Sequence, residues 1–148
     1  MNDFPRKPQL LLVEDNIAHV RLFQEALKDS KIFHEVAVVK NGVDAIAYLR
    51  QEDPYTSVSI PDLILLDLNL PKKDGREVLA ELKADPKLKR IPVLVLTTST
   101  NQEDIRNSYD LHANCYITKS RNLEQLLRTI RRIEEFWLDT VTLPSEGG

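Results

Sequence analysis

The chain has 148 residues, a length typical of one domain, with 42% hydrophobic residues, 29% charged residues and a formal net charge of −3. This balance excludes the overall basic excess that holds a nucleic-acid backbone, and no stretch approaches the roughly 20 apolar residues of a membrane-spanning helix. The single cysteine, Cys115, cannot form a disulfide within the chain, and the first residues lack the apolar core of a signal peptide. We therefore expect one cytoplasmic domain over residues 1–148, with no membrane or nucleic acid as a direct partner.

The first half of the chain alternates apolar runs with segments of helical periodicity. Residues 9–13, 35–39 and 63–66 are the apolar runs, and their Leu, Ile and Val content is typical of buried parallel strands. The apolar positions of the two helical segments between them are Val20, Phe23, Leu27, Ala45, Ile46 and Leu49. Residues 53–61, which contain two prolines, are expected to form a loop before the third strand.

The second half continues the alternation. Val78, Leu79 and Leu82 mark a third helix, and residues 92–96 and 115–118 are the last two apolar runs. The helix between these runs, residues 102–111, is poorly apolar, with Ile105 and Tyr109 as its expected anchors, so its exposed face is a candidate partner surface. Five β-then-α units in a row predict an α/β doubly wound parallel sheet.

The last predicted helix, residues 122–141, is long for packing against one five-stranded sheet. It would span about 30 Å at 1.5 Å per residue. Its apolar stripe would contain Leu123, Leu126, Leu127, Ile130, Ile133, Trp137 and Val141. Phe136 and Leu138 fall outside the stripe, so we expect the end of the helix to overhang the domain and present apolar area to a partner. The alternative is that this tail folds back over its own core.

Polar groups follow the predicted strands at the edge where the carboxyl ends of a parallel sheet converge. They are Glu14, Asp15, Asp67, Asn69, Thr97 and Lys119. Carboxylates about 4 Å apart repel by about 4 kcal/mol per pair at an effective dielectric of 20, so the acidic cluster needs protons or a bound cation. Oxygen-only ligands favour a hard ion such as Mg²⁺, while Lys119 and Thr97 supply a charge and a hydroxyl for a phosphate. The set suits a carboxylate nucleophile that attacks phosphorus.

Each of these residues also has an ordinary structural interpretation. An Asp after a strand is more often a turn or helix cap, and Glu14 and Asp15 could belong to an N-cap region. Thr97 could be a β-branched strand residue, and Lys119 could be a surface charge. Their occurrence together, on successive strand ends, favours a site.

The motifs around these residues resemble those of response-regulator receiver domains over about residues 10–138. The matching motifs are Leu12-Val13-Glu14-Asp15, Leu65-Leu66-Asp67-Leu68-Asn69-Leu70-Pro71, Asp74-Gly75, Val95-Leu96-Thr97-Thr98 and Tyr116-Ile117-Thr118-Lys119. The resemblance implies a flavodoxin-like (βα)5 fold with strand order 2-1-3-4-5, a core at about residues 8–138 and a C-terminal extension at 136–148. It also implies a stand-alone response regulator of a two-component phosphorelay, a switch and not an enzyme that turns over a substrate.

The same resemblance implies a role for each matched residue. Asp67 would accept the phosphoryl group from a histidine kinase, and Thr97 and Lys119 would bind that group. The implied Mg²⁺ ligands are Glu14, Asp15, Asp67 and the backbone carbonyl of Asn69. Tyr116 would change rotamer with Thr97 and report phosphorylation to the surface of the fourth helix, fifth strand and fifth helix; otherwise it is a core aromatic with a satisfied hydroxyl.

One position departs from the family pattern. Receivers commonly have a cis proline after the active-site lysine, whereas this chain has Ser120. A cis Lys119–Ser120 bond would cost about 2.5–4 kcal/mol, so either the site bears that strain or the bond is trans. Thr98 stands where receivers often have a small residue, and would narrow access to Asp67.

Three stretches also resemble the small regulators that partner cyanobacterial phytochromes: residues 114–120, the extended loop before the third strand, and residues 136–144. This narrower resemblance implies a phytochrome as the histidine kinase. It also implies a homodimer through the fourth helix, fifth strand and fifth helix, with Phe136 and Trp137 at the contact.

Three alternatives have distinct signatures. An aspartate-nucleophile phosphatase would place an acid two residues after the nucleophile, where this chain has Asn69. A flavin carrier would have a glycine- and hydroxyl-rich phosphate loop after the first strand, where Glu14 and Asp15 stand. A degenerate receiver acting as a protein-interaction scaffold would lack part of the acid, Asp, Thr and Lys set, which is complete here.

Overall fold

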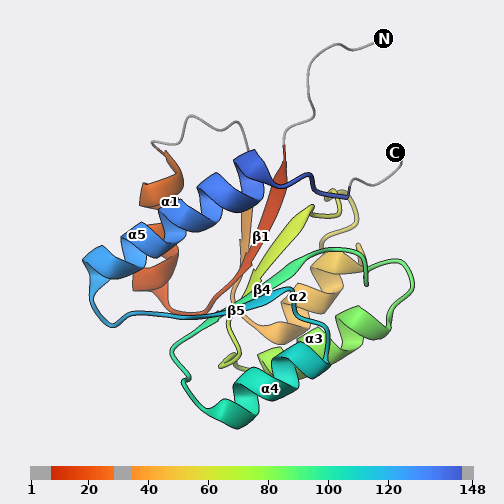
Figure 1. The fold of residues 1–148 in the computed structure, drawn as a ribbon. Coiled ribbons are helices and arrows are strands. Elements are labelled where there is room, and N and C mark those ends of the chain that lie inside the picture. The colour runs from red at the N-terminus through yellow and green to blue at the C-terminus, as the bar shows by residue number, and fades with distance from the viewer. Residues whose placement is uncertain (1–7, 29–34, 145–148) are drawn as a thin grey trace.

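The computed structural model describes residues 8–28 and 35–144, in which strands and helices alternate along the chain (Figure 1). The elements are β1 (Gln9–Val13), α1 (Ile17–Lys28), β2 (Glu35–Val39), α2 (Gly42–Leu49), β3 (Leu63–Leu66), α3 (Gly75–Ala84), β4 (Val93–Thr97), α4 (Gln102–Asp110), β5 (Cys115–Thr118), α5 (Leu123–Ile133) and the π-helical segment η1 (Glu134–Thr140). The predicted strands are confirmed, with the fourth shifted by one residue. Residues 1–7 and 145–148, at the ends of the predicted domain and its C-terminal extension, lie outside the described residues.

The five strands form one parallel sheet in the order β2-β1-β3-β4-β5, as the resemblance implied. Val13 pairs with Val39 on one side and Leu66 on the other, and Leu66 pairs with Val95. Thr97, the last residue of β4, pairs with Thr118 of β5. Because the strands end in register, the residues that follow them meet at one edge.

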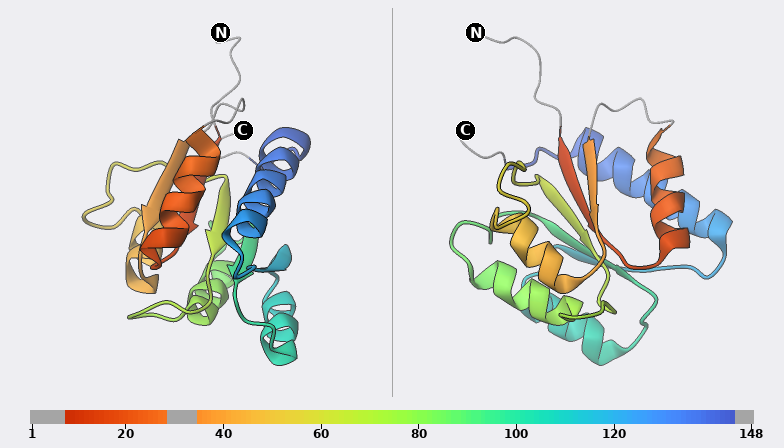
Figure 2. Two further views of the ribbon diagram at one scale, coloured as in Figure 1. Left: turned by 90° about the vertical axis from the view of Figure 1, so that its left-hand side faces the viewer. Right: turned by 180° about the vertical axis from the view of Figure 1, so that it is seen from behind.

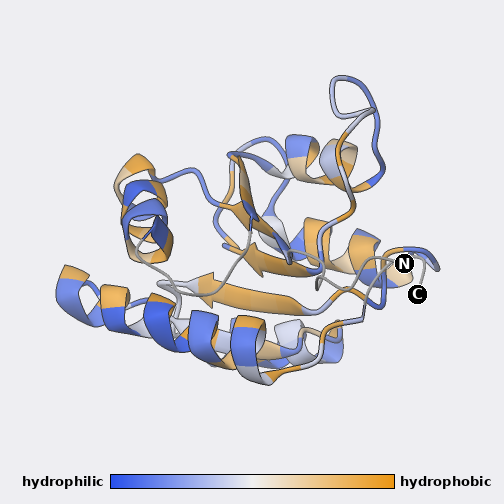
Figure 3. Cartoon of the chain, turned by 90° about the horizontal axis from the view of Figure 1, so that it is seen from above, coloured by the Kyte–Doolittle hydropathy of each residue, from blue (hydrophilic) through white to orange (hydrophobic). Residues whose placement is uncertain are grey.

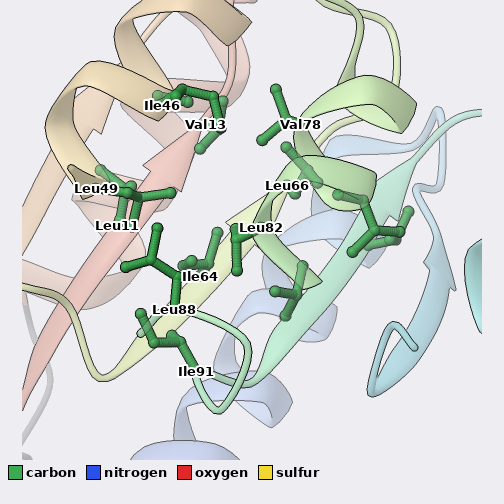
Figure 4. Close-up of a cluster of buried hydrophobic side chains, with 14 of the residues drawn as sticks. Leu11, Val13, Ile46, Leu49, Ile64, Leu66, Val78, Leu82, Leu88 and Ile91 are labelled. Atoms are coloured by element: carbon green, nitrogen blue, oxygen red, sulfur yellow. The ribbon is translucent and has the colours of Figure 1, made fainter. Parts of the chain in front are cut away.

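Helices cover both faces of the sheet, with α1 and α5 on one face and α2, α3 and α4 on the other (Figures 1 and 2). The three central strands are buried except for Gln9 at the start of β1, and their ribbons are mostly hydrophobic (Figure 3). Alternate residues of β1 enter different cores: Leu10 and Leu12 pack beneath α1 and α5, whereas Leu11 and Val13 pack with α2 and α3 (Figure 4).

Helix α4 is shallowly packed, as its composition predicts, but its anchors differ from expectation. Ile105 is half-buried and Ser108 is the buried residue, whereas Tyr109 is exposed, so its expected anchoring role is wrong. The hydroxyl of Tyr109 accepts a hydrogen bond from the backbone N–H of Tyr116 at 3.1 Å. That contact holds the ring along edge strand β5, where one side remains open to solvent.

The C-terminal helix follows the predicted range closely but changes its winding. Asn122 caps α5 by accepting hydrogen bonds from the N–H groups of Glu124 and Gln125. From residue 134 the chain is π-helical, and the N–H of Val141 donates to the carbonyl of Phe136 at 2.8 Å, five residues earlier.

The change of winding alters which side chains face the core. The buried stripe contains Leu126, Ile130 and Ile133, while Leu123 is exposed against expectation because it is the first residue of the helix. Trp137 and Leu138 pack against the core beneath α1 and α5, so the predicted overhang is wrong for them and the tail folds back on its own domain. Phe136 remains 54% exposed. Across residues 8–28 and 35–144, no helix combines the length and apolar character that crossing a membrane requires.

Candidate functional site

Four of the groups predicted from the strand ends come together: Glu14, Asp15, Asp67 and Lys119. Glu14 and Asp15 follow β1, Asp67 follows β3, and Lys119 follows β5. One carboxylate oxygen from each of the three acids lies within 4.8 Å of the other two. The register of the parallel strands produces this cluster, because β1 and β3 are neighbours whose last residues, Val13 and Leu66, are paired.

The ammonium group of Lys119 lies among these acids. It donates to Oδ2 of Asp67 at 2.9 Å and to Oε2 of Glu14, and its side chain is 1% exposed. The backbone N–H of Lys119 donates to the carbonyl of Thr97 at 2.7 Å, which fixes the start of the side chain beside β4. The Lys119–Ser120 peptide bond is trans, the cis bond of the described segments being Asp53–Pro54. Of the two arrangements left open by the sequence, the trans loop is the one present.

Glu14 is the most deeply buried acid of the cluster. Its side chain is 2% exposed, and burial raises the pKa of its carboxyl to about 7 against the opposing effect of the Lys119 ammonium. Its second oxygen, Oε1, accepts the backbone N–H of Asn16 at 3.1 Å. Glu14 is therefore engaged with the protein through both oxygens, whereas Asp15 is exposed.

Both oxygens of Asp67 also have partners. Oδ2 accepts from Lys119, and Oδ1 accepts the backbone N–H of Asn69 at 3.1 Å. The chain then turns closely into α3: a Cβ at Gly75 would lie 2.3 Å from the carbonyl oxygen of Asp67. Only glycine allows this approach, so the Asp74-Gly75 motif sets the position of the loop that carries Asp67.

Thr97 and Tyr116 lie on the β4 and β5 side of the cluster. Thr97 is completely buried, and its hydroxyl has no hydrogen-bond partner within the protein. A buried polar group without a partner is costly, and a ligand oxygen beside it would remove that cost. The Tyr116 hydroxyl donates to the carbonyl of Ser99 at 2.9 Å, and the half-buried ring packs against the core beneath α2 and α3.

A second charged network, which the sequence analysis missed, joins the starts of α3 and α4. Both Nε and Nη2 of Arg76 donate to Asp104 at 2.8 Å, and Nη1 donates to Asp74 at 3.0 Å. Ser99 adds a hydrogen bond of 2.7 Å to Asp104. Hydrogen bonds from Arg76, and then from Ser99, hold the pKa of the Asp104 carboxyl below its usual value. Arg76 and Asp104 are 28 residues apart, so no local pattern announces the pair.

His19 is the other residue that sequence reasoning missed. It lies in the first turn of α1, and its Nδ1 is 3.1 Å from the ammonium nitrogen of Lys119. His19 and Lys119 are 100 residues apart in the chain, so no local pattern predicts this contact.

The predicted dimer residues lie away from the acidic cluster. The rings of Phe136 and Trp137 meet edge to face with their centroids 5.7 Å apart. They line a depression of about 310 Å³ together with Ile117 of β5 and residues of α5.

The donor set of the cluster fits a divalent cation. Its candidate ligands are carboxylate oxygens from three acids, one of them exposed. Oxygen-only sets of this kind select hard ions such as Mg²⁺ or Mn²⁺ over soft metals.

Comparison with known proteins gives consistent results. Residues 10–131 match the family described as the response regulator receiver domain. The response regulator Rcp1 of Synechocystis sp. is 58% identical to this chain. The alignment of 146 residues covers 98% of this chain and 99% of Rcp1.

Two solved structures have the same fold at high identity. The Mn²⁺-bound form of response regulator Rcp1 superposes with a TM-score of 0.92 at 59% identity, covering 93% of this chain and 99% of that one. The phosphorylated cyanobacterial phytochrome response regulator RcpA superposes with a TM-score of 0.92 at 65% identity, covering 95% and 100%.

Proposed function

Because this chain belongs to the response regulator receiver family, we propose that Asp67 is its phosphoacceptor within a two-component phosphorelay. The observation that carries the proposal is the ion pair of 2.9 Å between Asp67 and a fully buried Lys119, inside a cluster of three acids. A buried lysine between two carboxylates at the edge of a sheet is expensive to maintain for stability alone. Binding a phosphoryl group is a use that matches its charge.

Each residue has a chemical part in the transfer. An oxygen of Asp67 attacks phosphorus, the bond from phosphorus to the donor's leaving group breaks, and an acyl phosphate forms. Lys119 exchanges its hydrogen bond to Asp67 for one to a phosphoryl oxygen, and the unpartnered hydroxyl of Thr97 donates to another. Tyr116, which packs on the β4 and β5 side, then reports the movement of Thr97 to α4, β5 and α5.

We propose Mg²⁺ as the physiological cation. Asp15, Asp67 and the backbone carbonyl of Asn69 would hold it, with Glu14 as the buried acid beside them. When bound, the ion neutralises negative charge at the attacking carboxylate and the incoming phosphoryl group. The engagement of Glu14 with Lys119 supports Asp15 as the more direct of the two β1 acids.

The cognate histidine kinase is proposed to be a cytoplasmic phytochrome. The support is the likeness to the cyanobacterial phytochrome response regulator RcpA across nearly the whole chain. Phosphotransfer from a panel of purified kinases tests this: a phytochrome kinase should transfer fastest. Faster transfer from an unrelated kinase would contradict it.

A homodimer through α4, β5 and α5 is proposed to include Phe136 and Trp137. The exposure of Phe136 at 54% beside the depression at β5 supports that placement. Phe136→Ala should shift the protein toward monomer in sedimentation velocity, because it removes an exposed ring without disturbing the core. Trp137→Ala should do so as well, with some loss of stability, because this ring also packs on its own domain. A dimer unchanged by Phe136→Ala would contradict this interface.

The phosphoacceptor proposal is tested with a small phosphoryl donor. Acetyl phosphate with Mg²⁺ should add one phosphoryl group to the wild-type chain in intact-mass measurements, and none to Asp67→Asn. Asp139→Asn is the control, since Asp139 is exposed on η1. No labelling of the wild-type chain, or equal labelling of Asp67→Asn, would overturn the proposal in favour of a scaffold without phosphotransfer.

A further inference from the structure

The ammonium group of Lys119 has three neighbours in the protein. Two are the carboxylates of Glu14 and Asp67, and the third is Nδ1 of His19 at 3.1 Å. A lysine ammonium has three N–H donors and no acceptor. The three contacts therefore account for all of its hydrogen bonds.

This arrangement fixes the protonation of His19. Since Lys119 can only donate, Nδ1 must present its lone pair, and the ring proton of a neutral imidazole is then on Nε2. Partial burial and the adjacent Lys119 charge both lower the pKa of His19, which agrees with a neutral ring.

Other partners do not explain the position of the ring. The capping contact at the start of α1 uses the backbone N–H of His19, which donates to Asn16 at 3.2 Å, and leaves the imidazole free for another role. The nearest Glu14 oxygen lies 3.9 Å from Nδ1 and already accepts the N–H of Asn16. Lys119 is thus the closest polar contact of Nδ1.

We propose that His19 is a positioning residue for Lys119 during phosphoryl transfer. Of the two carboxylates that hold the ammonium, Asp67 gives up its hydrogen bond to Lys119 when its oxygen attacks phosphorus, and Glu14 lies beside the proposed cation. His19 is uncharged, and a hard divalent ion prefers the carboxylate oxygens to its nitrogen. Its hydrogen bond therefore persists and keeps the ammonium directed toward the phosphoryl group. This inference rests on the proposed function of Asp67.

The test uses three substitutions in the full chain with acetyl phosphate and Mg²⁺. Asn has its side-chain oxygen at the place of Nδ1, whereas Gln extends its oxygen to the place of Nε2, and Leu has no acceptor. We expect His19→Leu and His19→Gln to lower the initial rate of Asp67 labelling by about tenfold, the effect of losing a hydrogen bond to a charged group. His19→Asn should remain within about twofold of wild type. Gln24→Leu, on an exposed part of α1, is the control and should match wild type.

The rescue pattern separates positioning from a structural role. If all three His19 variants lose the same activity, or if His19→Leu keeps the wild-type rate, the inference is overturned. Thermal unfolding of each variant checks that the rate differences do not follow stability.

An independent measurement needs no phosphorylation. In ¹⁵N NMR spectra at neutral pH, Nδ1 of His19 should appear unprotonated, and the Lys119 ammonium should exchange slowly in wild type and His19→Asn but rapidly in His19→Leu. A proton on Nδ1 would overturn the inference. If the wild-type chain is not labelled at all, the proposed function fails and the positioning role fails with it, while these resonances still decide whether His19 accepts a hydrogen bond from Lys119.

Discussion

Two ion-pair networks flank the carboxyl end of the sheet, and they differ in burial far more than in distance. Lys119 lies 2.9 Å from Asp67 with its side chain 1% exposed, while Arg76 lies 2.8 Å from Asp104 with its side chain 37% exposed. In the buried network the charges have left water, so each depends on its partner. In the half-exposed network water and salt screen the same contact. Similar distances therefore imply different energies and different uses: a charged site ready for a ligand, and a brace between α3 and α4.

The largest expected difference in stability between the networks appears when the positively charged side chain of the buried network, Lys119, is replaced. Lys119→Met leaves Glu14 and Asp67 as buried acids without their counter-charge, and should lower the free energy of unfolding by about 3–5 kcal/mol at pH 8 in the presence of a chelator. Chemical denaturation measures the loss, and Lys87→Met, at an exposed position, should change stability by no more than about 0.5 kcal/mol. A loss as small as that of the control would show that the buried network behaves like a surface pair.

A divalent cation should stabilise the buried network and leave the other unchanged. Mg²⁺ or Mn²⁺ at 100 times its dissociation constant for the wild-type chain should raise the free energy of unfolding of that chain by about 2.7 kcal/mol, because the ion binds only the folded cluster. Asp15→Asn should reduce this gain by weakening the binding, while Asp104→Asn should keep it in full. Equal stabilisation of wild type and Asp15→Asn would place the ion elsewhere.

The smallest expected effect belongs to the half-exposed network. A double-mutant cycle with Arg76→Met and Asp104→Asn should give a coupling of about 0.2–1 kcal/mol that decreases in high salt. The pKa of Asp104 is depressed in the folded state, so its contribution is present above the ordinary carboxyl value of 3.8 and is lost as pH falls below it. Coupling that is constant from pH 7 to pH 2, or insensitive to salt, would contradict this account.

The strands, the helices and most of the site could be predicted, because they are determined by the periodicity of apolar residues and by the common direction of the strands. Buried strands such as β3 can be identified in the sequence as continuous apolar runs. The parallel register then brings Glu14, Asp67 and Lys119 to the carboxyl end of the sheet. Once the topology is known, the site follows, because its residues directly follow their strands.

The missed features depend on contacts that no local pattern encodes. Arg76 meets Asp104 across 28 residues, and His19 meets Lys119 across 100. The predicted overhang of the last helix is wrong for a different reason. That prediction uses the ideal period of 3.6 residues per turn, whereas π-helical winding after Ile133 turns Leu138 toward the core. The prediction that Tyr109 anchors α4 in the core is wrong because its hydroxyl binds the backbone of the edge strand β5, a contact that the position of Tyr109 on the helix does not indicate.

Chemical trapping shows which residue carries the phosphoryl group. After reaction with acetyl phosphate and Mg²⁺, borohydride converts a phosphorylated aspartate to homoserine, which tandem mass spectrometry locates in the digested chain. We expect homoserine in the peptide that contains Asp67 and at no other acid. Homoserine at Asp15 or at any other acid, or at no position, would contradict the assignment of Asp67.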